Sequence, residues 1–90
     1  MGKKPVKLED VIKSFLVTEK ALRLAAQNYV VAYVDLNADK KAIKNAMEKI
    51  YKVKVVKVNV LNTPKNKKKA YIKLSKEFNA EEFLSKLGLI

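Results

Sequence analysis

The clearest pattern in the chain is the alternation of residues 69–75, in which every second side chain is apolar. The apolar phase consists of Ala70, Ile72 and Leu74, and the outward phase consists of Lys69, Tyr71 and Lys73. Because successive side chains of a strand point to opposite faces of a sheet, this segment is predicted to be a strand. One face of it packs on the core, and the other presents a basic surface with a tyrosine in it.

Residues 53–61 also alternate, but the phase of the alternation changes partway. Val53 and Val55 belong to one phase, whereas the valines at positions 56, 58 and 60 continue one residue out of step. A β-bulge near Val55 and Val56 would return all of these valines to one apolar face. The next eight residues, 62–69, hold one Pro, one Thr, two Asn and four Lys, which predicts a turn and therefore a hairpin.

The run at residues 29–36 is rich in β-formers and has no turn residue within it. Both of its phases are largely apolar, which predicts a central strand covered on both sides. Residues 8–17 are less decisive, since a short helix and a short edge strand fit the pattern equally well.

Three helices are predicted from their end signals. Thr18 is a suitable N-cap with Glu19 in the first turn, and Asn28 ends that helix. Either Asn37 or Asp39 caps the second helix. The apolar stripe of the second helix consists of Ile43, Ala46, Met47 and Ile50.

The last helix has the most complete set of end signals. Asn79 and Glu82 have the spacing of a capping box, and Phe78 and Phe83 have the spacing of a hydrophobic staple. Phe83, Leu84 and Leu87 are expected to pack, and Gly88 ends the helix. The alternation of helices and strands around one hairpin, without a linker, predicts a single α+β domain over residues 8–90. A basic arm, residues 1–7, precedes it.

Composition and charge narrow the class of partner. The chain has 90 residues, of which 49% are hydrophobic and 32% charged, so it has room for one core. Twenty Lys and Arg against nine Asp and Glu give a net charge of +11, which favours a polyanionic partner.

An enzyme is not expected, because the chain has no His and no Cys and so lacks the usual general base, thiol nucleophile and metal ligands. Asp35 and Asp39 are expected to act in helix capping rather than in metal binding. No catalytic residue, metal ligand or cofactor is predicted.

The lysines carry the functional signal. Four of them lie on the predicted hairpin tip, others lie on the strands that lead to it, and Tyr71 offers a ring for stacking. The predicted nucleic-acid surface comprises Lys3, Lys4, Lys7, Lys13, Lys20, Arg23, Lys54, Lys57, Lys65, Lys67, Lys68, Lys69, Tyr71 and Lys73. The alternative interpretation is a solvated lysine face that only maintains solubility.

The ratio of Lys to Arg indicates which features of a nucleic acid such a surface recognises. The chain has 19 Lys and 1 Arg. Arg is the residue of bidentate base reading, whereas Lys is a mobile point charge, so backbone and shape are expected to be read rather than sequence. Structured RNA fits this better than a DNA operator. Arg23 either grips one phosphate or makes a surface contact with Glu19 or Gln27.

Five segments in order resemble the universal large-subunit ribosomal protein 23 family, in an archaeal-type short form. They are residues 17–21, 28–34, 42–51, 53–59 and 68–74, and the resemblance extends over roughly residues 11–87. It implies a three-layer α/β/α fold with a four-stranded antiparallel sheet and a short first strand near residues 12–16.

The resemblance also implies a cellular role. Members bind large-subunit rRNA at the rim of the polypeptide exit tunnel, beside ribosomal protein 29 of the large subunit, in the cytoplasm. They help to dock the signal recognition particle, the nascent-chain-associated complex or the translocon. Glu19 matches the acidic position that contacts a ribosome-associated chaperone in bacterial members, so it is the expected docking residue. Its alternative role is to balance the neighbouring positive charges.

One departure from the family bears on the hairpin. Bacterial members carry a long basic tip rich in Gly and Arg, whereas residues 62–69 contain neither residue type. Eight residues folded back on themselves reach only about 13 Å, so this tip is expected to anchor at the tunnel rim rather than line the tunnel. The competing interpretation of the whole chain is a free-standing chromatin protein or RNA chaperone without a fixed site.

Overall fold

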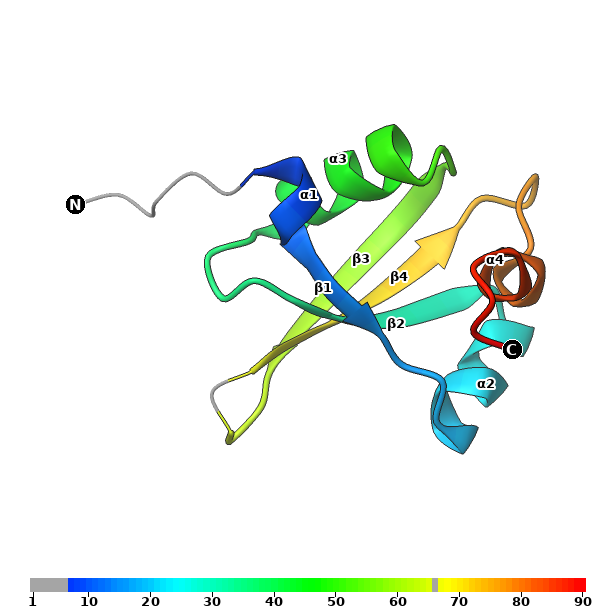
Figure 1. Ribbon diagram of the computed structural model, residues 1–90, viewed down its shortest axis with the longest axis horizontal. Helices are drawn as coiled ribbons and strands as arrows, with labels where there is room; N and C mark the ends of the chain where they lie inside the picture. The colour runs from blue at the N-terminus through cyan, green and yellow to red at the C-terminus, as the bar shows by residue number, and fades with distance from the viewer. Residues whose placement is uncertain (1–6, 66) are drawn as a thin grey trace.

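The computed structural model describes residues 7–65 and 67–90, so Lys3 and Lys4 of the predicted arm lie outside the described residues. The elements are α1 Leu8–Val11, β1 Ile12–Phe15, α2 Glu19–Ala26, β2 Tyr29–Val34, α3 Lys40–Ile50, β3 Val55–Asn62, β4 Lys68–Leu74 and α4 Ala80–Lys86. The four strands form one sheet in the order β1-β2-β4-β3, with every neighbouring pair antiparallel (Figure 1). The predicted α+β domain is confirmed.

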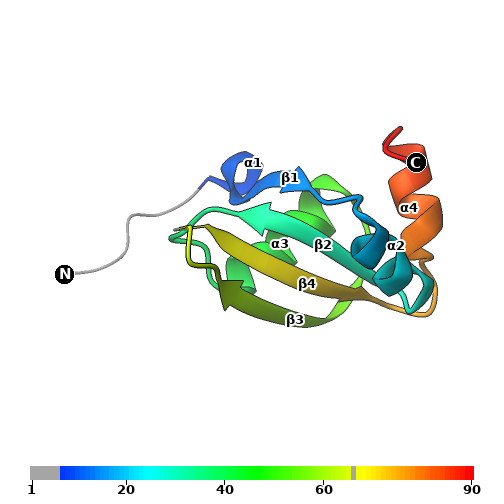
Figure 2. The same ribbon diagram turned by 90° about the horizontal axis from the view of Figure 1, so that it is seen from below.

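Helices cover both faces of the sheet, which gives the three layers that the family resemblance implied. Figure 2 shows α3 on the far side of the sheet and α2 at the end of β2. Phe15 of β1, Tyr51 at the end of α3 and Phe83 of α4 meet edge to face, with ring centroids 5.2–5.6 Å apart. This contact joins α3 and α4 on one side of the sheet. On the other side, α2 lies over Val31 and Tyr71.

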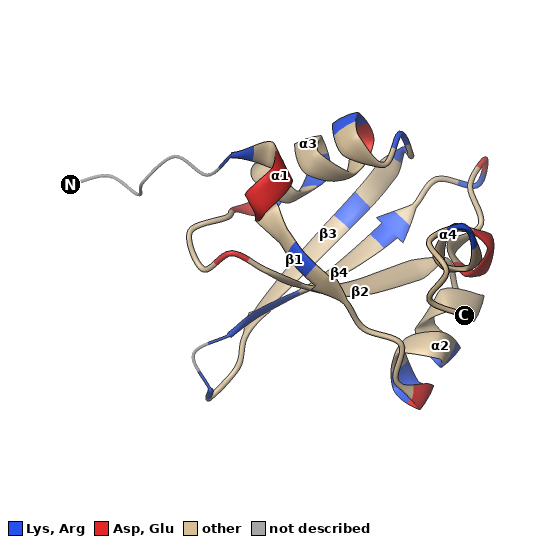
Figure 3. Ribbon diagram, viewed as in Figure 1, with Lys and Arg blue, Asp and Glu red and all other residues tan. Residues whose placement is uncertain are grey.

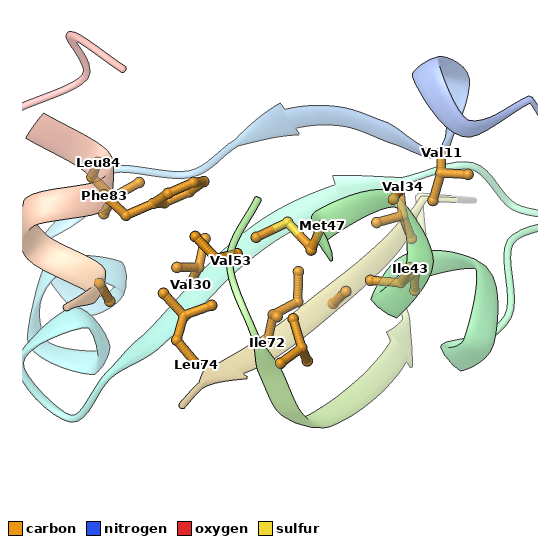
Figure 4. Packing of buried hydrophobic residues seen from close by; sticks show 14 of the residues in the cluster. Val11, Val30, Val34, Ile43, Met47, Val53, Ile72, Leu74, Phe83 and Leu84 are labelled. Atoms are coloured by element: carbon orange, nitrogen blue, oxygen red, sulfur yellow. The ribbon is translucent and has the colours of Figure 1, made fainter. Parts of the chain in front are cut away.

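The core lies between α3 and the sheet (Figure 4). Ala70, Ile72 and Leu74 are at most 1% exposed, so the phase predicted for residues 69–75 is confirmed. Ile43 and Met47 of α3 are fully buried against the same core. Burying each large apolar side chain stabilises the fold by about 1.5–3 kcal/mol. No polar or charged side chain among the described residues is fully buried.

The predicted β-bulge is present. The register between β3 and β4 shifts between Val55 and Lys57, which leaves Val56 outside the regular ladder. Val58 and Val60 are half-buried on the core side, as expected. Val56 itself is 63% exposed, so the expectation that it joins the apolar face is wrong. A bulged residue has no opposite partner, and its side chain is therefore free to point outward.

Residues 8–17 contain both of the structures that the pattern left open. The turn of helix α1 places Val11, which is fully buried, against α3, and the chain then continues directly as β1. The backbone N–H of Asp35 donates to the carbonyl of Val11 at 2.9 Å. The short first strand implied by the family resemblance is confirmed, with Ile12–Phe15 as its bounds.

The predicted helix caps are largely confirmed. Thr18 Oγ1 accepts the N–H of Ala21 at 3.2 Å, and Asp39, not Asn37, caps α3 by accepting the N–H of Ala42 at 2.8 Å. At the end of α4, Gly88 has a φ of 76°, and the N–H groups of Gly88 and Leu89 donate to Ser85 and Leu84. These paired bonds form a Schellman motif, whose left-handed position favours glycine.

The cap of α4 is simpler than the sequence predicted. Asn79 accepts the N–H of Glu82 at 3.1 Å, but the Glu82 carboxylate lies 3.6 Å from Lys86 Nζ, so it pairs along the helix. Three apolar side chains predicted to pack are substantially exposed, namely Leu36, Ile50 and Leu87. Each lies at or beyond the end of its element, where the facing layer no longer covers it. Within the described part of the chain, no helix is long and apolar enough to cross a membrane.

Candidate nucleic-acid interface

Three rows of side chains cross the sheet face that α3 leaves uncovered, and we call this surface the open face. From β2 through β4 to β3, the rows are Tyr29, Lys73 and Lys57; Val31, Tyr71 and Asn59; Tyr33, Lys69 and Leu61. The antiparallel pairing sets these residues directly opposite one another. The open face therefore combines tyrosine rings with lysines, whose positions along β3, β4 and the hairpin are blue in Figure 3.

Tyrosine rings of β2 make cation–π contacts with lysines of the neighbouring strand and of the hairpin loop. Lys73 Nζ lies 5.5 Å from the centre of the Tyr29 ring. Lys67 Nζ and Lys69 Nζ lie 5.1 and 5.8 Å from the centre of the Tyr33 ring. Each such cation–π contact is worth about 0.5–1 kcal/mol at an exposed site. The rings thus restrict ammonium groups that would otherwise be mobile.

Tyr71 lies between Lys69 and Lys73 on the outward phase of β4, as predicted. It is half-buried because α2 covers part of the sheet here. Lys20 and Leu24 of α2 border a small hollow together with Val31, Lys69 and Tyr71. Lys20, predicted from sequence to belong to the interface, is therefore close to Lys69 of β4.

Like charges oppose each other on the open face. Lys57 of β3 and Lys73 of β4 are cross-strand partners, and Lys54 is exposed just before β3 begins. Like charges directly opposite in a sheet are destabilising. In the described residues, none of these three lysines forms an ion pair with a carboxylate. A phosphate group placed between them would remove the repulsion.

Lys68 departs from the predicted surface. Its side chain takes the same phase as Ala70, away from the open face, and its Nζ donates a hydrogen bond to the carbonyl of Ala38. Lys68 therefore links the start of β4 to the segment before α3. The prediction that it lies on the hairpin tip is wrong, because it belongs to β4, where one step along the strand reverses the direction of a side chain. A contact of Lys68 with rRNA stays a prediction.

The hairpin turn is shorter than the sequence predicted. Asn62 belongs to β3, and both Lys68 and Lys69 belong to β4, so the predicted turn at residues 62–69 contracts to residues 63–67. The loop closes where Lys67 O accepts hydrogen bonds from the N–H and hydroxyl of Thr63, at 2.8 and 3.0 Å. Lys65 and Lys67 remain exposed on it.

Lys13 of β1 lies near the end of β2 and contacts Asp35, with Nζ 3.5 Å from Oδ2. The backbone N–H of Asn37 donates to Asp35 Oδ1 at 2.8 Å. This hydrogen bond first, and then the Lys13 ammonium and more weakly Lys68, hold the pKa of Asp35 below its ordinary value of 3.8, although burial acts against them. The N-cap of α3 is Asp39, so the prediction that Asp35 caps a helix is wrong; Asp35 instead stabilises the turn after β2.

Replacing Asp35 with Asn is expected to make the free energy of unfolding less sensitive to acid. A carboxyl whose pKa is lowered in the folded state contributes stability above its unfolded pKa, near 3.8, and loses it as the pH falls through the folded value. The pair is partly exposed, so the difference at pH 7 should be below about 1 kcal/mol. Urea unfolding at pH 7 and at pH 2.5 measures this. Curves for the two proteins that keep the same separation at both pH values would contradict the expectation.

Arg23 makes the surface contact that was one of its two predicted roles. Its Nη2 lies 3.1 Å from Glu19 Oε1 one turn away on α2, and both side chains are more than three-quarters exposed. An exposed pair of this kind contributes about 0.3–0.5 kcal/mol and leaves Arg23 able to exchange partners. Lys7 is the N-cap residue of α1, and α1 contacts α3, which covers the opposite side of the sheet from the open face.

Sequence reasoning missed Tyr29 and Tyr33 because both phases of their strand were read as covered. In the structure, Tyr29 and Tyr33 lie on one phase of β2 and are its two half-buried residues, with their rings on the open face. The sequence-based prediction also did not include the lysines at the start of α3 in the interface. There Lys40, Lys41 and Lys44 surround a shallow hollow of about 170 Å³ with Val56 and Lys57. The basic surface therefore continues around the free edge of β3.

The described residues contain no group of three carboxylates that could hold a metal ion. The residues predicted for the interface separate into three groups. The open face holds Lys57, Lys69, Tyr71 and Lys73, with Lys20 and Lys54 next to it. The second group consists of Lys65 and Lys67 on the hairpin loop and Lys13 on β1, beside the end of β2. The third group, Lys7, Arg23 and Lys68, is not brought to the open face.

Comparison with known proteins gives the class of this molecule. The chain is 54% identical over 81 residues to a large ribosomal subunit protein uL23 of Pyrobaculum aerophilum, a match that covers 89% of this chain and 100% of the relative. It is 47% identical over 83 residues to the uL23 protein of Caldivirga maquilingensis, covering 91% and 96%. The uL23 protein of Methanococcus aeolicus is 44% identical over 81 residues, covering 89% and 94%.

These relatives are all ribosomal proteins. The family model for Ribosomal protein L23 matches residues 10–81. The chain belongs to the ribosomal protein L23 family.

Proposed function

We propose that this protein is a structural component of the large ribosomal subunit, and that it binds large-subunit rRNA through the open face and the hairpin loop. Family membership supports the ribosomal role, since the relatives are named as proteins of the large subunit. The observation that supports RNA as the ligand is the facing pair Lys57 and Lys73, with the Tyr29 ring beside Lys73 in the same row. We place the protein in the cytoplasm, as part of this ribonucleoprotein.

The mode of binding follows from the residue types. Lysines held over tyrosine rings present ammonium groups at positions that the sheet defines, which suits a phosphate backbone of defined shape. The rings add stacking surface for an unpaired base or a ribose. The chain has one Arg against 19 Lys, so bidentate reading of bases contributes little to this mode.

The position in the subunit is proposed from the family. We place the protein at the rim of the polypeptide exit tunnel, beside ribosomal protein 29 of the large subunit. The loop at residues 63–67 is too short to follow the tunnel inward, so it serves as an rRNA anchor at the rim through Lys65 and Lys67. The signal recognition particle, the nascent-chain-associated complex or the translocon would dock on the outward side.

Sedimentation tests this proposal against a free-standing nucleic-acid-binding protein. Lysate from cells that carry a tagged copy is washed at high salt and separated on a sucrose gradient. We expect the protein to remain with the large subunit at one copy per particle. A protein that leaves the ribosome on washing, or that distributes over nucleic acid at variable stoichiometry, would favour the chromatin or RNA-chaperone alternative.

Glu19 is the proposed docking residue on the outward side. Its carboxylate is 85% exposed at the start of α2, beside Arg23. Glu19→Ala is expected to change the free energy of unfolding by less than about 0.5 kcal/mol, because the ion pair is exposed. It should nevertheless reduce co-sedimentation of the signal recognition particle with assembled ribosomes.

The control for Glu19 is Glu82→Ala. Glu82 also belongs to an exposed pair one helical turn apart, with Lys86 on α4. We expect that variant to dock normally. Equal docking by both variants would leave Glu19 as a balancer of local charge and remove it from the proposed docking surface.

A further inference from the structure

A pocket of about 420 Å³ lies where the end of β2 meets the start of β4 and the hairpin loop. Its volume is within the range of sites that hold small organic ligands. The lining residues that carry chemistry are Lys13, Ser14, Tyr33, Asp35, Asn37, Lys67 and Lys68, of which Lys68 is already bonded to the carbonyl of Ala38. They come from β1, β2, the turn after β2 and the loop before β4, so the pocket exists only in the folded sheet.

The groups in this pocket match the parts of a nucleotide. Tyr33 supplies a half-buried aromatic ring, which suits a base. Lys67, with its Nζ 5.1 Å from the centre of that ring, supplies a cation for a phosphate. Ser14 and Asn37 supply a hydroxyl and an amide that can bond to a sugar or a base edge. By contrast, the central rows of the open face offer lysines and rings on a flatter surface.

We propose that this pocket holds one unstacked ribonucleotide of the bound RNA, with its base on the Tyr33 ring and its phosphate at Lys67. This inference rests on the proposed function, because it assigns a subsite to the same RNA. Stacking of a base on an aromatic ring is stronger than the contact of an exposed lysine with that ring. The base therefore displaces Lys67, which then pairs with the phosphate that the base brings with it.

Asp35 sets the orientation of the nucleotide in the pocket and the bases that the pocket prefers. Its carboxylate is held by the N–H of Asn37 at 2.8 Å and by Lys13 at 3.5 Å. A carboxylate repels phosphate, so the phosphate lies toward Lys67 and the base edge toward Asp35. Each carboxylate oxygen accepts more than one hydrogen bond, and Asp35 is thus free to accept from an exocyclic amino group. Adenine and cytosine carry such a group, whereas uracil does not.

Titration of the full-length, ¹⁵N-labelled protein with RNA hexamers tests the subsite. The probes are hexamers of adenylate, cytidylate and uridylate, which carry the same charge. We expect the adenylate and cytidylate hexamers to bind more tightly than the uridylate hexamer, and the amide signals of Ser14, Asn37 and Lys67 to shift. Equal binding of all three probes, without shifts at the pocket, would overturn the proposal.

Substitutions in the pocket separate the contribution of base stacking to RNA binding from the contribution of charge. Tyr33→Leu is expected to weaken adenylate binding roughly tenfold at constant salt slope, because stacking releases no counterions. Tyr33→Phe keeps the ring and should restore binding, and Asp35→Asn should narrow the difference between cytidylate and uridylate. If Tyr33→Leu does not fold, the ranking of the three probes on the wild-type protein decides the question.

Binding of the protein to large-subunit rRNA tests the proposed function independently of the pocket. If rRNA still binds with a steep salt dependence while the hexamers show no ranking, the pocket is not a nucleotide site but the rRNA interface stands. If the wild-type protein binds neither the rRNA nor the hexamers, the proposed function itself is wrong.

Discussion

Replacing Lys54, Lys57, Lys69 and Lys73 together with Ala is expected to flatten the salt dependence of rRNA binding. Each lysine–phosphate contact contributes about 0.7–0.9 to the slope of log affinity against log salt, so four contacts contribute about 3. Between 50 and 200 mM salt, the variant should therefore lose roughly 60-fold less affinity than the wild-type protein. Binding of a large-subunit rRNA fragment, measured by filter retention at several salt concentrations, gives the slope.

The structure gives a reason to expect that these four lysines act together. Lys57 and Lys73 are opposite each other, and Lys69 lies on the same phase of β4. In the free protein they repel one another. Their removal relieves this repulsion but also loses the contacts of Lys69 with Tyr33 and of Lys73 with Tyr29. The two effects oppose each other, so the free energy of unfolding should change by no more than about 1 kcal/mol, and urea unfolding of the variant checks that it is folded.

A matched control removes three exposed lysines that lie away from the open face. Lys49, Lys76 and Lys86 lie at the end of α3, in the turn before α4 and on α4. We expect the triple Ala variant to change the slope by much less per lysine than the quadruple variant does. The same change per lysine in both variants would show that the protein binds RNA only through its net charge, with no defined face.

Replacing Asn28 with Ala is expected to lower the free energy of unfolding by about 3–4 kcal/mol. The Asn28 side-chain amide donates to the carbonyls of Leu74 and Ser75 at 2.9 and 3.1 Å, and its oxygen accepts the N–H of Ala80 at 2.8 Å. Three lost hydrogen bonds cost about 3 kcal/mol, with the partner groups left inside the fold. The backbone of Asn28 adds to this, since its φ is 69°.

This loss is large for a small domain. Ninety residues correspond to a total free energy of unfolding of roughly 5–13 kcal/mol. For a domain of this size, a loss of about 3–4 kcal/mol lowers the melting temperature by about 12–25 °C. One side chain has this effect because it joins the end of α2 to the end of β4 and to the first turn of α4. Ala80 is the first residue of α4, and its N–H would otherwise lack a partner.

Two further variants separate the contribution of the Asn28 hydrogen bonds from the contribution of its backbone conformation. Asn28→Gly loses the same hydrogen bonds but adopts a positive φ without strain, so it should be more stable than Asn28→Ala by about 1 kcal/mol. Asn28→Asp keeps the acceptor for Ala80 and loses both donors. Thermal unfolding followed by circular dichroism ranks the three. If Asn28→Ala melts within about 3 °C of the wild-type protein, the side chain does not have the joining role assigned to it.

Local pattern was sufficient wherever one face of an element was clearly buried. The strand at residues 69–75 was predictable because Ala70, Ile72 and Leu74 repeat with the period of a strand, and a shift of one residue would expose all three. The bulge was predictable for the same reason, since the valines change phase at Val55. Caps at Thr18 and Asn79 followed from side chains that bond to backbone only two or three residues away.

The sequence alone was also sufficient to predict a polyanionic partner, because net charge and the excess of Lys over Arg do not depend on the fold. Only the tertiary structure decided which lysines lie on one surface. Lys68 and Lys69 are adjacent in sequence, yet one is bonded to Ala38 and the other lies over Tyr33. The partners of both come from a segment some thirty residues or more away, and the register between β2 and β4 sets them. Local periodicity carries no information about that register, so Tyr33 and its pocket emerged only from the folded sheet.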